Sequence, residues 1–319
     1  MSATAPESAT APESASALAH PGVCVSVAPL RALRRLAQAR VGLRRDAETL
    51  TPGAVVSRRR GRGLEAVDIR PFVHGDDPRH IDRNVTARTG RPHVRSFHDE
   101  RALATLLVAD FRPPMLWGTR TRFCSVAAAM ALALIGWRAA AAGGRVGLLA
   151  AHGDQTTLAP LRPLERGMEA AIGALVAAHD AGLRAGAGAA AAPLAPALRD
   201  ALALAPRGGD VALATSFEAP GDAAQRAEAL ALIAALARRA RLRLLLVRDA
   251  FETAPPPGLY PMATAGGPAF WARIRRGAAP PPDPRPALLR QLGAQVTLID
   301  ADATPEQMLA AMEAPDGRR

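Results

Sequence analysis

The chain has 319 residues, of which 49% are hydrophobic and 3% aromatic, a size that suits one large domain or two. All of the positive charge behind its formal net charge of +11 is arginine, because the sequence contains no lysine. The two cysteines, Cys24 and Cys124, form no CxxC pair, which excludes a disulfide framework and indicates a reducing compartment.

The first 27 residues are low in sequence complexity. SATAPE occurs twice, and Glu7 and Glu13 stand where a secretory signal would carry basic residues. Serine, alanine, proline and glutamate at this density cannot bury enough apolar surface to fold. We therefore expect a disordered tail over residues 1–27.

The stretch Pro29–Arg45 has leucine, valine and alanine at nearly helical intervals and arginine at many of the other positions. Such a basic amphipathic helix can dock on its own domain with a solvated arginine face, or it can lie on a membrane or a phosphate backbone. The pattern favours docking. It leaves open a contact with membrane or nucleic acid.

A glycine-punctuated basic loop, Ser57–Gly63, leads into a short segment with two strand-like stretches. Leu64–Phe72 alternates roughly as a strand, His74–Pro78 forms a turn, and Pro92–His98 alternates again. These stretches predict a small antiparallel β element. With the preceding helix it makes up a segment over residues 28–101.

From residue 102 to residue 313 apolar runs alternate with helical stretches. Continuous apolar strands between helices predict an α/β fold with a doubly wound, mostly parallel sheet covered on both faces. The stretches 182–196 and 254–284 are rich in alanine, glycine and proline and predict irregular connections, and residues 314–319 form a tail. The expected strands are Thr105–Ala109, Val146–Ala150, Val211–Ala214, Leu242–Val247 and Val296–Ile299. The expected helices are Thr121–Ala142, Pro163–His179, Pro196–Ala205, Ala223–Arg239, Pro286–Leu292 and Thr304–Glu313, the last with Thr304 as its N-cap.

Membrane insertion is not expected. The most apolar stretch, Ser125–Trp137, is shorter than the about 20 residues that a bilayer span needs, and Arg122 and Arg138 flank it. We expect it to be a buried helix.

Histidines and aspartates gather between residues 74 and 99. They could form a zinc or iron site, or a salt-bridge network that joins Asp76 or Asp77 to Arg79 and Arg88. No pair has the spacing of a His-Glu-x-x-His motif, so the network is the favoured interpretation. The histidines are His74, His80, His93 and His98, and the aspartates are Asp76, Asp77, Asp82 and Asp99.

The nucleophiles of the chain lack the motifs that activate such groups. Ser125 and Ser216 lie outside any Gly-x-Ser-x-Gly sequence, and Cys124 begins an apolar helix as a small buried residue. A phosphate loop ending in Gly-Lys-Ser or Gly-Lys-Thr is excluded because lysine is absent. We therefore expect no enzymatic activity.

The residues from 61 to 88 form a specific pattern. They are Gly61, Gly63 and Glu65; Arg70, Phe72, Gly75 and Asp76; Arg79, Ile81 and Asp82; and Thr86, Ala87 and Arg88. This pattern resembles the signature of the bacterial family called domain of unknown function 58, whose members carry a von Willebrand factor type A-like domain. Arg145–Leu149 and Asp249–Glu252 resemble later landmarks of the family, while Phe72 and Arg83 replace a tyrosine and a tryptophan. The resemblance covers about residues 28–313.

Asp110 ends the first apolar strand, where open α/β folds place their binding chemistry. In the family's fold an Asp-x-Ser-x-Ser sequence at this point commonly holds a divalent ion. Here Arg112 and Pro114 replace the two serines, and Ser216 stands at a later acidic position. A hard cation such as Mg²⁺ needs oxygen ligands, so we expect no metal or other cofactor, with Asp110 as the one remaining ligand if a site survives. Arg112 is expected to pair with Asp110 instead.

The resemblance implies a function as well as a fold. Members of the family are encoded with MoxR-type AAA+ ATPases, which implies an adaptor for that ATPase and an unknown client protein. Many members carry N-terminal membrane helices, and the acidic repeat tail stands in their place here, so we expect a cytoplasmic location. We expect Asp110, Arg112 and Ser216 to bind the partner. The residues expected to support the segment structurally are Arg70, Gly75, Asp76, Arg79, Asp82 and Arg88. The alternatives are a domain with a degenerate divalent-metal site and a basic nucleic-acid-binding protein, the second weakened because arginine-rich composition also follows from GC-rich coding.

Overall fold

The fold is taken from a computed structural model of the chain. It describes residues 20–48, 68–73, 78, 81–96, 104–186, 192–217, 223–263, 269–276 and 282–314. The tail expected over residues 1–27 lies outside the described residues as far as residue 19. Residues 20–26 contact the main body, because the Phe123 amide donates a 2.8 Å hydrogen bond to the Gly22 carbonyl and Val25 is buried. Residues 20–26, which we expected to belong to the tail, therefore pack against the main body.

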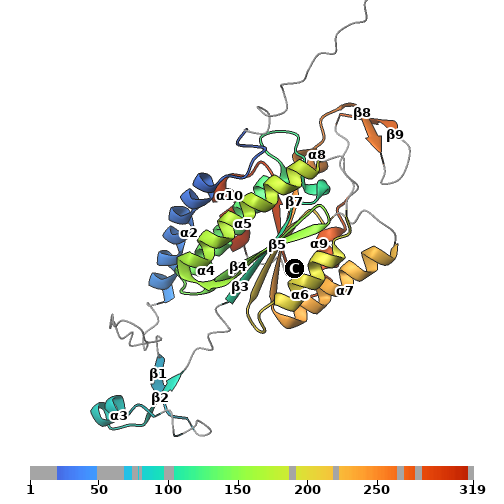
Figure 1. The fold of residues 1–319 in the computed structure, drawn as a ribbon. Coiled ribbons are helices and arrows are strands. Elements are labelled where there is room, and N and C mark those ends of the chain that lie inside the picture. Colours follow the sequence, from blue (N-terminus) through green and yellow to red (C-terminus); the bar gives the residue numbers. More distant parts are fainter. Residues whose placement is uncertain are drawn as a thin grey trace, which may run out of the picture.

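A six-stranded sheet forms the centre of the molecule (Figure 1). Its strand order is β10-β7-β6-β3-β4-β5, and every neighbouring pair is parallel except β4 and β5. Counted along the chain and read from the β5 edge, this order is the 3-2-1-4-5-6 order of a doubly wound sheet. The strands are β3 (Ala104–Asp110), β4 (Arg145–His152), β5 (Gln155–Pro163), β6 (Asp210–Thr215), β7 (Arg241–Arg248) and β10 (Gln295–Asp300). The expected fold class, an α/β fold with a mostly parallel sheet, is confirmed.

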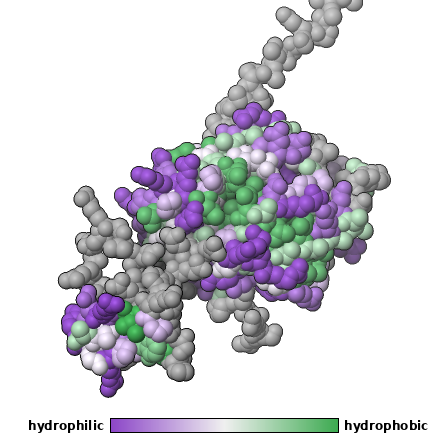
Figure 2. Space-filling view, turned by 60° about the horizontal axis from the view of Figure 1, so that its bottom comes forward, coloured by the Kyte–Doolittle hydropathy of each residue, from purple (hydrophilic) through white to green (hydrophobic). Residues whose placement is uncertain are grey.

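Helices cover both faces of the sheet, as Figure 1 shows. Alternate residues of β3 face opposite cores, with Leu107 in the first and Leu106 in the second. The first face carries α2 (Val27–Glu48), α4 (Cys124–Ala141), α5 (Leu164–Ala185) and α10 (Pro305–Glu313). The second carries α6 (Ala195–Leu204), α7 (Ala223–Arg239) and α9 (Arg285–Gln291). Hydrophilic side chains border the apolar areas left on the surface (Figure 2).

The central helix α4 is almost entirely buried. It is long and apolar enough to cross a membrane, but 78% of it lies inside the protein. Its small residues allow close packing: a Cβ at Gly136 would lie 2.4 Å from the sulfur of Met168 on α5. The helix therefore serves as the packing centre of the first core.

Helix α2 docks on α4, as its sequence pattern favoured. Leu30 and Leu33 are buried in the first core. The Trp137 indole donates a 2.9 Å hydrogen bond to the Leu30 carbonyl, and the Arg34 guanidinium lies 5.5 Å from the centre of the Trp137 ring. The described arginines Arg31 and Arg34 pair with glutamates on α5.

The expected small antiparallel element is present. Strand β1 (Asp68–Pro71) pairs with β2 (His93–Ser96), and a helix that the sequence did not predict, α3 (Arg83–Thr89), lies between them in the chain. The Asp82 carboxylate caps α3 by accepting bonds of 2.9 and 3.0 Å from the next helical amides. The helix ends at Gly90, whose φ of 68° is a left-handed conformation that glycine adopts without strain.

Two further differences from the sequence-based expectation concern strands. Strand β5 is an antiparallel edge strand where a connection was expected before the helix at residue 163. Within the supposedly irregular stretch 254–284 the chain forms a hairpin of β8 (Gly258–Ala263) and β9 (Ala269–Ile274). Helix α5 also continues to Ala185, into the stretch expected to be a connection.

Candidate functional site

The order of the strands changes direction between β3 and β6. In a doubly wound sheet the helices leave in opposite directions at this point, which opens a crevice at the carboxyl ends of the two strands. Asp110 ends β3, and Thr215 ends β6. The structure thus places Asp110 at the carboxyl edge of the sheet, at the end of the first parallel strand, as the sequence predicted.

Arg112 fills this crevice and pairs with Asp110, as expected from the sequence. Its Nε and Nη2 donate bonds of 2.9 and 2.8 Å to the two carboxylate oxygens, and its amide adds a third of 3.1 Å. The side chains are only 1% and 0% exposed. The Nη1 group donates a 2.6 Å bond to the Ala192 carbonyl, so the guanidinium also fixes the chain that leads into α6.

Thr215 completes the hydrogen bonding of the Asp110 carboxylate from the other strand. Its hydroxyl donates a 2.6 Å bond to Oδ2 of Asp110 and accepts a 2.9 Å bond from the Phe217 amide. That amide belongs to a residue with φ of 51°, a left-handed conformation that disfavours a bulky side chain. The two strand ends are thus joined through one buried carboxylate that accepts four hydrogen bonds.

The donor set does not fit a divalent cation. Both oxygens of Asp110 are already engaged, and the guanidinium of Arg112 lies beside them where it would repel a cation. The next residues, Pro113 and Pro114, have no side-chain oxygen. Across the described parts of the chain, His, Cys, Asp and Glu side chains form no group of three that could hold a metal.

Ser216 is also buried, with 1% of its surface exposed. Its amide donates to the Met115 sulfur at 3.0 Å, and its carbonyl accepts a 2.9 Å bond from Arg285. Asp110 and Arg112, the other two residues predicted to bind a partner, are as deeply buried. In this conformation a partner would meet the residues around these three.

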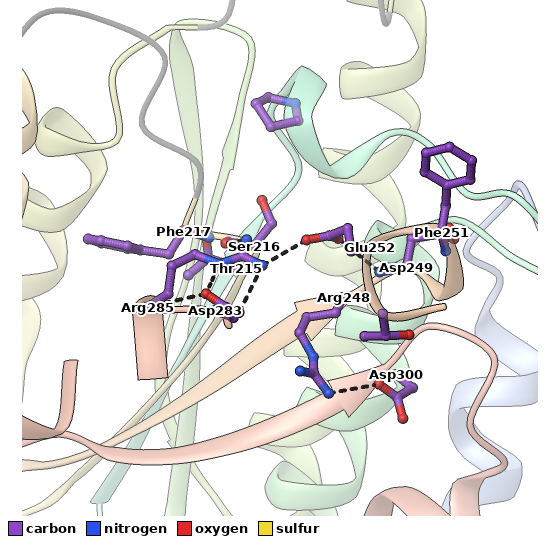
Figure 3. Close-up of polar contacts among 12 residues, drawn as sticks. Thr215, Ser216, Phe217, Arg248, Asp249, Phe251, Glu252, Asp283, Arg285 and Asp300 are labelled. Carbon is purple, nitrogen blue, oxygen red and sulfur yellow. Dashed lines mark hydrogen bonds and ion pairs between the residues drawn. The ribbon is translucent and has the colours of Figure 1, made fainter. Parts of the chain in front are cut away.

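Arg285, at the start of α9, lies beside the end of β6 and forms a partly exposed rim there, with its side chain 22% exposed (Figure 3). Its Nη2 donates bonds of 2.7 Å to Glu252 and 3.0 Å to Asp283, and its Nε donates 2.9 Å to Asp283. Burial lowers the pKa of Arg285, but its hydrogen bonds with the two carboxylates outweigh this and raise it. Burial raises the pKa of Asp283, but the hydrogen bonds and charge of Arg285 outweigh it and hold the pKa below its usual value. Arg285 and Asp283 are therefore both charged at neutral pH.

The rim continues along the ends of β7 and β10. Arg248 ends β7 and pairs with Asp300 at 3.2 Å, with the aspartate side chain 63% exposed (Figure 3). Asp249 is buried and accepts hydrogen bonds from the Thr119 amide, the Thr119 hydroxyl and the Phe251 amide. It shares a capping box with Glu252, which fixes the carboxylate of Glu252 toward Arg285.

Sequence reasoning did not predict the rim residues. Arg285 and Glu252 are 33 positions apart, and they meet only because α9 and the end of β7 lie at the same edge. One local signal was available: the Asp249-x-x-Glu252 spacing is that of a capping box. The resemblance to the family had also pointed to Asp249 and Glu252, but not to Arg285.

A buried serine and histidine also contact each other. The Ser125 hydroxyl lies 2.9 Å from Nε2 of His179, and both residues are 0% exposed. Burial lowers the pKa of His179 to about 4, so the ring is neutral near pH 7. The pair lies between α4 and α5, where neither side chain is in contact with solvent.

The predicted signature residues are partly outside the described residues. The residues outside are Gly75, Asp76 and Arg79 of the signature, together with His74, Asp77, His80, His98 and Asp99 of the expected ionic network. Arg88 is exposed near the end of α3, and Arg70 belongs to β1. Nδ1 of His93 lies 2.8 Å from the Arg91 carbonyl.

These features define a doubly wound α/β protein whose switch-point crevice is closed by its own buried ion pair. The chain belongs to the family described as protein of unknown function DUF58, whose profile matches residues 68–256. The match includes the small antiparallel element, Asp110, Thr215 and the capping box at Asp249. It confirms the family expected from the pattern at residues 61–88.

Relatives are found in mycobacteria. Uncharacterized proteins of Mycobacterium bovis and of two strains of Mycobacterium tuberculosis are each 39% identical to the chain over 105 residues, 32% of this chain and 32% of the relative. The matched part thus spans about a third of the length of these curated relatives. No solved structure matches the chain.

Proposed function

We propose that this protein is a non-enzymatic protein-interaction module of the von Willebrand factor type A kind. In this proposal it is an adaptor that works with a MoxR-type AAA+ ATPase in assembling or maturing other protein complexes. One observation carries the proposal: Arg112 occupies the crevice in which the fold would bind a ligand, and its charge neutralises Asp110. A crevice closed in this way favours recognition by the surface around it over chemistry within it.

The arrangement of the sheet supports the domain type. Asp110 ends the first parallel strand of the sheet, as the family resemblance implies, and the antiparallel strand β5 lies at the edge. The replacement of the ion-binding serines by Arg112 and Pro114 then explains why the module would act without a metal.

The rim supports recognition of a protein. Positive and negative groups alternate along it, from Arg285 with Glu252 and Asp283 to Arg248 with Asp300. Partly exposed charges of mixed sign provide complementarity and register to a partner, more than raw affinity. Buried Asp110, Arg112 and Ser216 would act by holding these groups in place.

The test is a binding measurement between the purified chain and the MoxR-type ATPase encoded nearest to it, carried out with ATP and with ADP. Asp300→Arg reverses an exposed rim charge and should weaken binding about tenfold or more. Asp210→Arg is the matched control, because Asp210 also pairs with an arginine but lies at the opposite edge of the sheet. Equal effects of both variants, or no binding by the unchanged chain, would contradict the proposal.

Elemental analysis separates the adaptor from a metal-dependent domain. Purified protein should contain no stoichiometric Mg²⁺ or Mn²⁺, because Asp110 has no free oxygen for a cation. Stoichiometric metal that is lost in Asp110→Asn would show that the carboxylate exchanges Arg112 for an ion.

A further inference from the structure

The hairpin formed by β8 and β9 carries four of the nine large hydrophobic side chains that are exposed in the described chain. It lies beyond the residues that match the family, which end at residue 256. Figure 1 shows it standing out from the body beside the short helix α8 (Ala250–Thr253). Tyr260, Phe270 and Trp271 all lie in it, although only 3% of the whole chain is aromatic.

The hairpin exposes large apolar side chains on both of its faces. Cross-strand neighbours share a face, so the pairing of Pro261 with Trp271 puts this tryptophan on one face. The pairing of Met262 with Phe270 puts these two residues on the other face. Trp271 is 66% exposed and Phe270 48% exposed.

The base of the hairpin, in contrast, is attached to the body. The Tyr260 ring packs edge-on against Phe251 with ring centres 4.9 Å apart, and its hydroxyl donates a 3.0 Å bond to the Pro256 carbonyl. The apolar surface is therefore presented by an anchored hairpin and is concentrated on its outer part.

Positive charge follows the apolar residues along the second strand. Arg273 is exposed and lies opposite Leu259, and Arg275 and Arg276 come directly after the strand. The sequence from residue 253 to residue 282 contains no aspartate or glutamate. The hairpin region is thus uniformly basic.

We propose that this hairpin docks the protein peripherally on an anionic lipid surface. Met262, Phe270 and Trp271 enter the boundary between headgroups and acyl chains, and the arginines contact lipid phosphates. Three residue steps separate the Met262–Phe270 pair from the Leu259–Arg273 pair, which is about 10 Å of strand. Apolar groups of peripheral proteins penetrate about 5–10 Å, so the arginines lie at headgroup level when the tip is inserted.

The two-faced exposure favours lipid over a protein partner. A protein that packs on a two-stranded ribbon covers one face and leaves the other in water. A lipid interface surrounds the inserted tip, so it covers Trp271 and Phe270 together. Tryptophan is also enriched at such interfaces, and anionic lipids attract clustered arginine.

The test is flotation of the full chain with vesicles of phosphatidylcholine, with and without about 30% phosphatidylserine, at about 0.1 M salt. We expect binding to the anionic vesicles that weakens as salt is added. Because each arginine near the surface contributes roughly fivefold in affinity, Arg273→Glu/Arg275→Glu/Arg276→Glu should abolish measurable binding. The charge-matched control is Arg162→Glu/Arg207→Glu/Arg226→Glu, which changes three exposed arginines elsewhere.

The apolar contribution is tested in the same way. Phe270→Ser/Trp271→Ser should weaken vesicle binding about tenfold or more. Leu158→Ser/Leu164→Ser is its control, because both leucines are 51% exposed on the body. All of these side chains are solvent-exposed, so thermal denaturation should show that each variant folds.

Several outcomes would overturn the lipid proposal. They are absence of vesicle binding, equal binding to neutral and anionic vesicles, and equal losses in the hairpin and control variants. Loss of ATPase capture by the hairpin variants without any vesicle binding would assign the hairpin to a protein partner instead.

Discussion

Two aspartate–arginine pairs with nearly the same geometry lie at opposite edges of the sheet. Arg112 and Asp110 form two parallel bonds of 2.9 and 2.8 Å at the carboxyl edge. Arg241 and Asp210 form two of 2.9 Å at the amino edge. The first pair is 1% and 0% exposed and the second 66% and 41%. The bond lengths do not distinguish the pairs, whereas their surroundings do.

The difference shows where a charge pair determines structure. In water, competition and screening reduce a bidentate pair to a small stabilisation. In the protein interior each charge requires the other, because a lone buried ion has lost its hydration without compensation. The buried pair therefore contributes to specifying one arrangement of the crevice, and the exposed pair tolerates change.

The largest expected effect comes from removing one member of the buried pair. Asp110→Ala should lower the free energy of unfolding by about 3–5 kcal/mol, because it leaves the Arg112 guanidinium buried and unpaired. Asp210→Ala should cost less than about 1 kcal/mol. Urea denaturation of both variants measures the difference, and equal losses would remove the distinction between the pairs.

Removing both buried charges sharpens the same comparison. Asp110→Leu/Arg112→Met should be more stable than Asp110→Ala, because neither ion is left alone. A double variant as unstable as the single one would show that packing of the crevice, and not charge, is what Asp110 provides.

Thr215→Val tests the third member of the buried group. The substitution keeps the shape but removes the donor to Asp110 and the acceptor for the Phe217 amide. We expect a loss of about 1.5–3 kcal/mol in urea denaturation, the usual range for a hydrogen bond to a charged group. Thr215→Ser should restore most of it, since it returns the hydroxyl.

The pH dependence of stability tests a buried group that has no oppositely charged partner among the described residues, His179. His179, whose ring meets Phe111 edge-on, has a folded pKa of about 4 because of burial. The unfolded chain therefore binds more protons between about pH 6.5 and 4, so stability is full above this window and falls as pH decreases through it. Between pH 7 and 5 we expect a loss of about 2 kcal/mol from this residue. His179→Gln should flatten the pH dependence, and an unchanged slope would assign it to other groups.

The smallest expected effect is that of Arg241→Ala. It should change the free energy of unfolding by less than about 1 kcal/mol, and added salt should reduce the difference further. Urea denaturation at low and high salt measures this. A larger effect that does not depend on salt would mean that solvent does not screen this pair as its exposure predicts.

Much of the fold could be predicted from the sequence, because parallel strands buried on both faces leave continuous apolar runs. Strand β3 and its end at Asp110 were identified in this way, and the N-cap of α10 at Thr304 followed from local chemistry. Strand β5 was missed because it is an edge strand. Its sequence QTTLAPLRP is mostly exposed, and prolines are tolerated where one side of the ladder is open. Helix α3 was missed because it buries no side chain that would leave an apolar pattern.

The site was predictable only in part, because contacts between residues far apart in the sequence leave no local pattern. Arg112 lies two residues from Asp110, so their pairing could be inferred from chemistry alone. Thr215 is 105 residues from Asp110, and only the sheet order brings the two together. The exposed hairpin was hidden in a stretch whose proline content predicted irregular structure, because such composition does not reveal which strands pair.

The docking of α2 on α4 also has a consequence for the order of folding during synthesis. Leu30 and Trp137, which share a hydrogen bond, are 107 residues apart. The ribosome therefore releases α2 well before its packing partner exists, and closing so long a loop carries an entropic cost. Helix α2 should remain undocked until α4 has been made. A helix made early in synthesis therefore joins the first core only after a helix made about a hundred residues later.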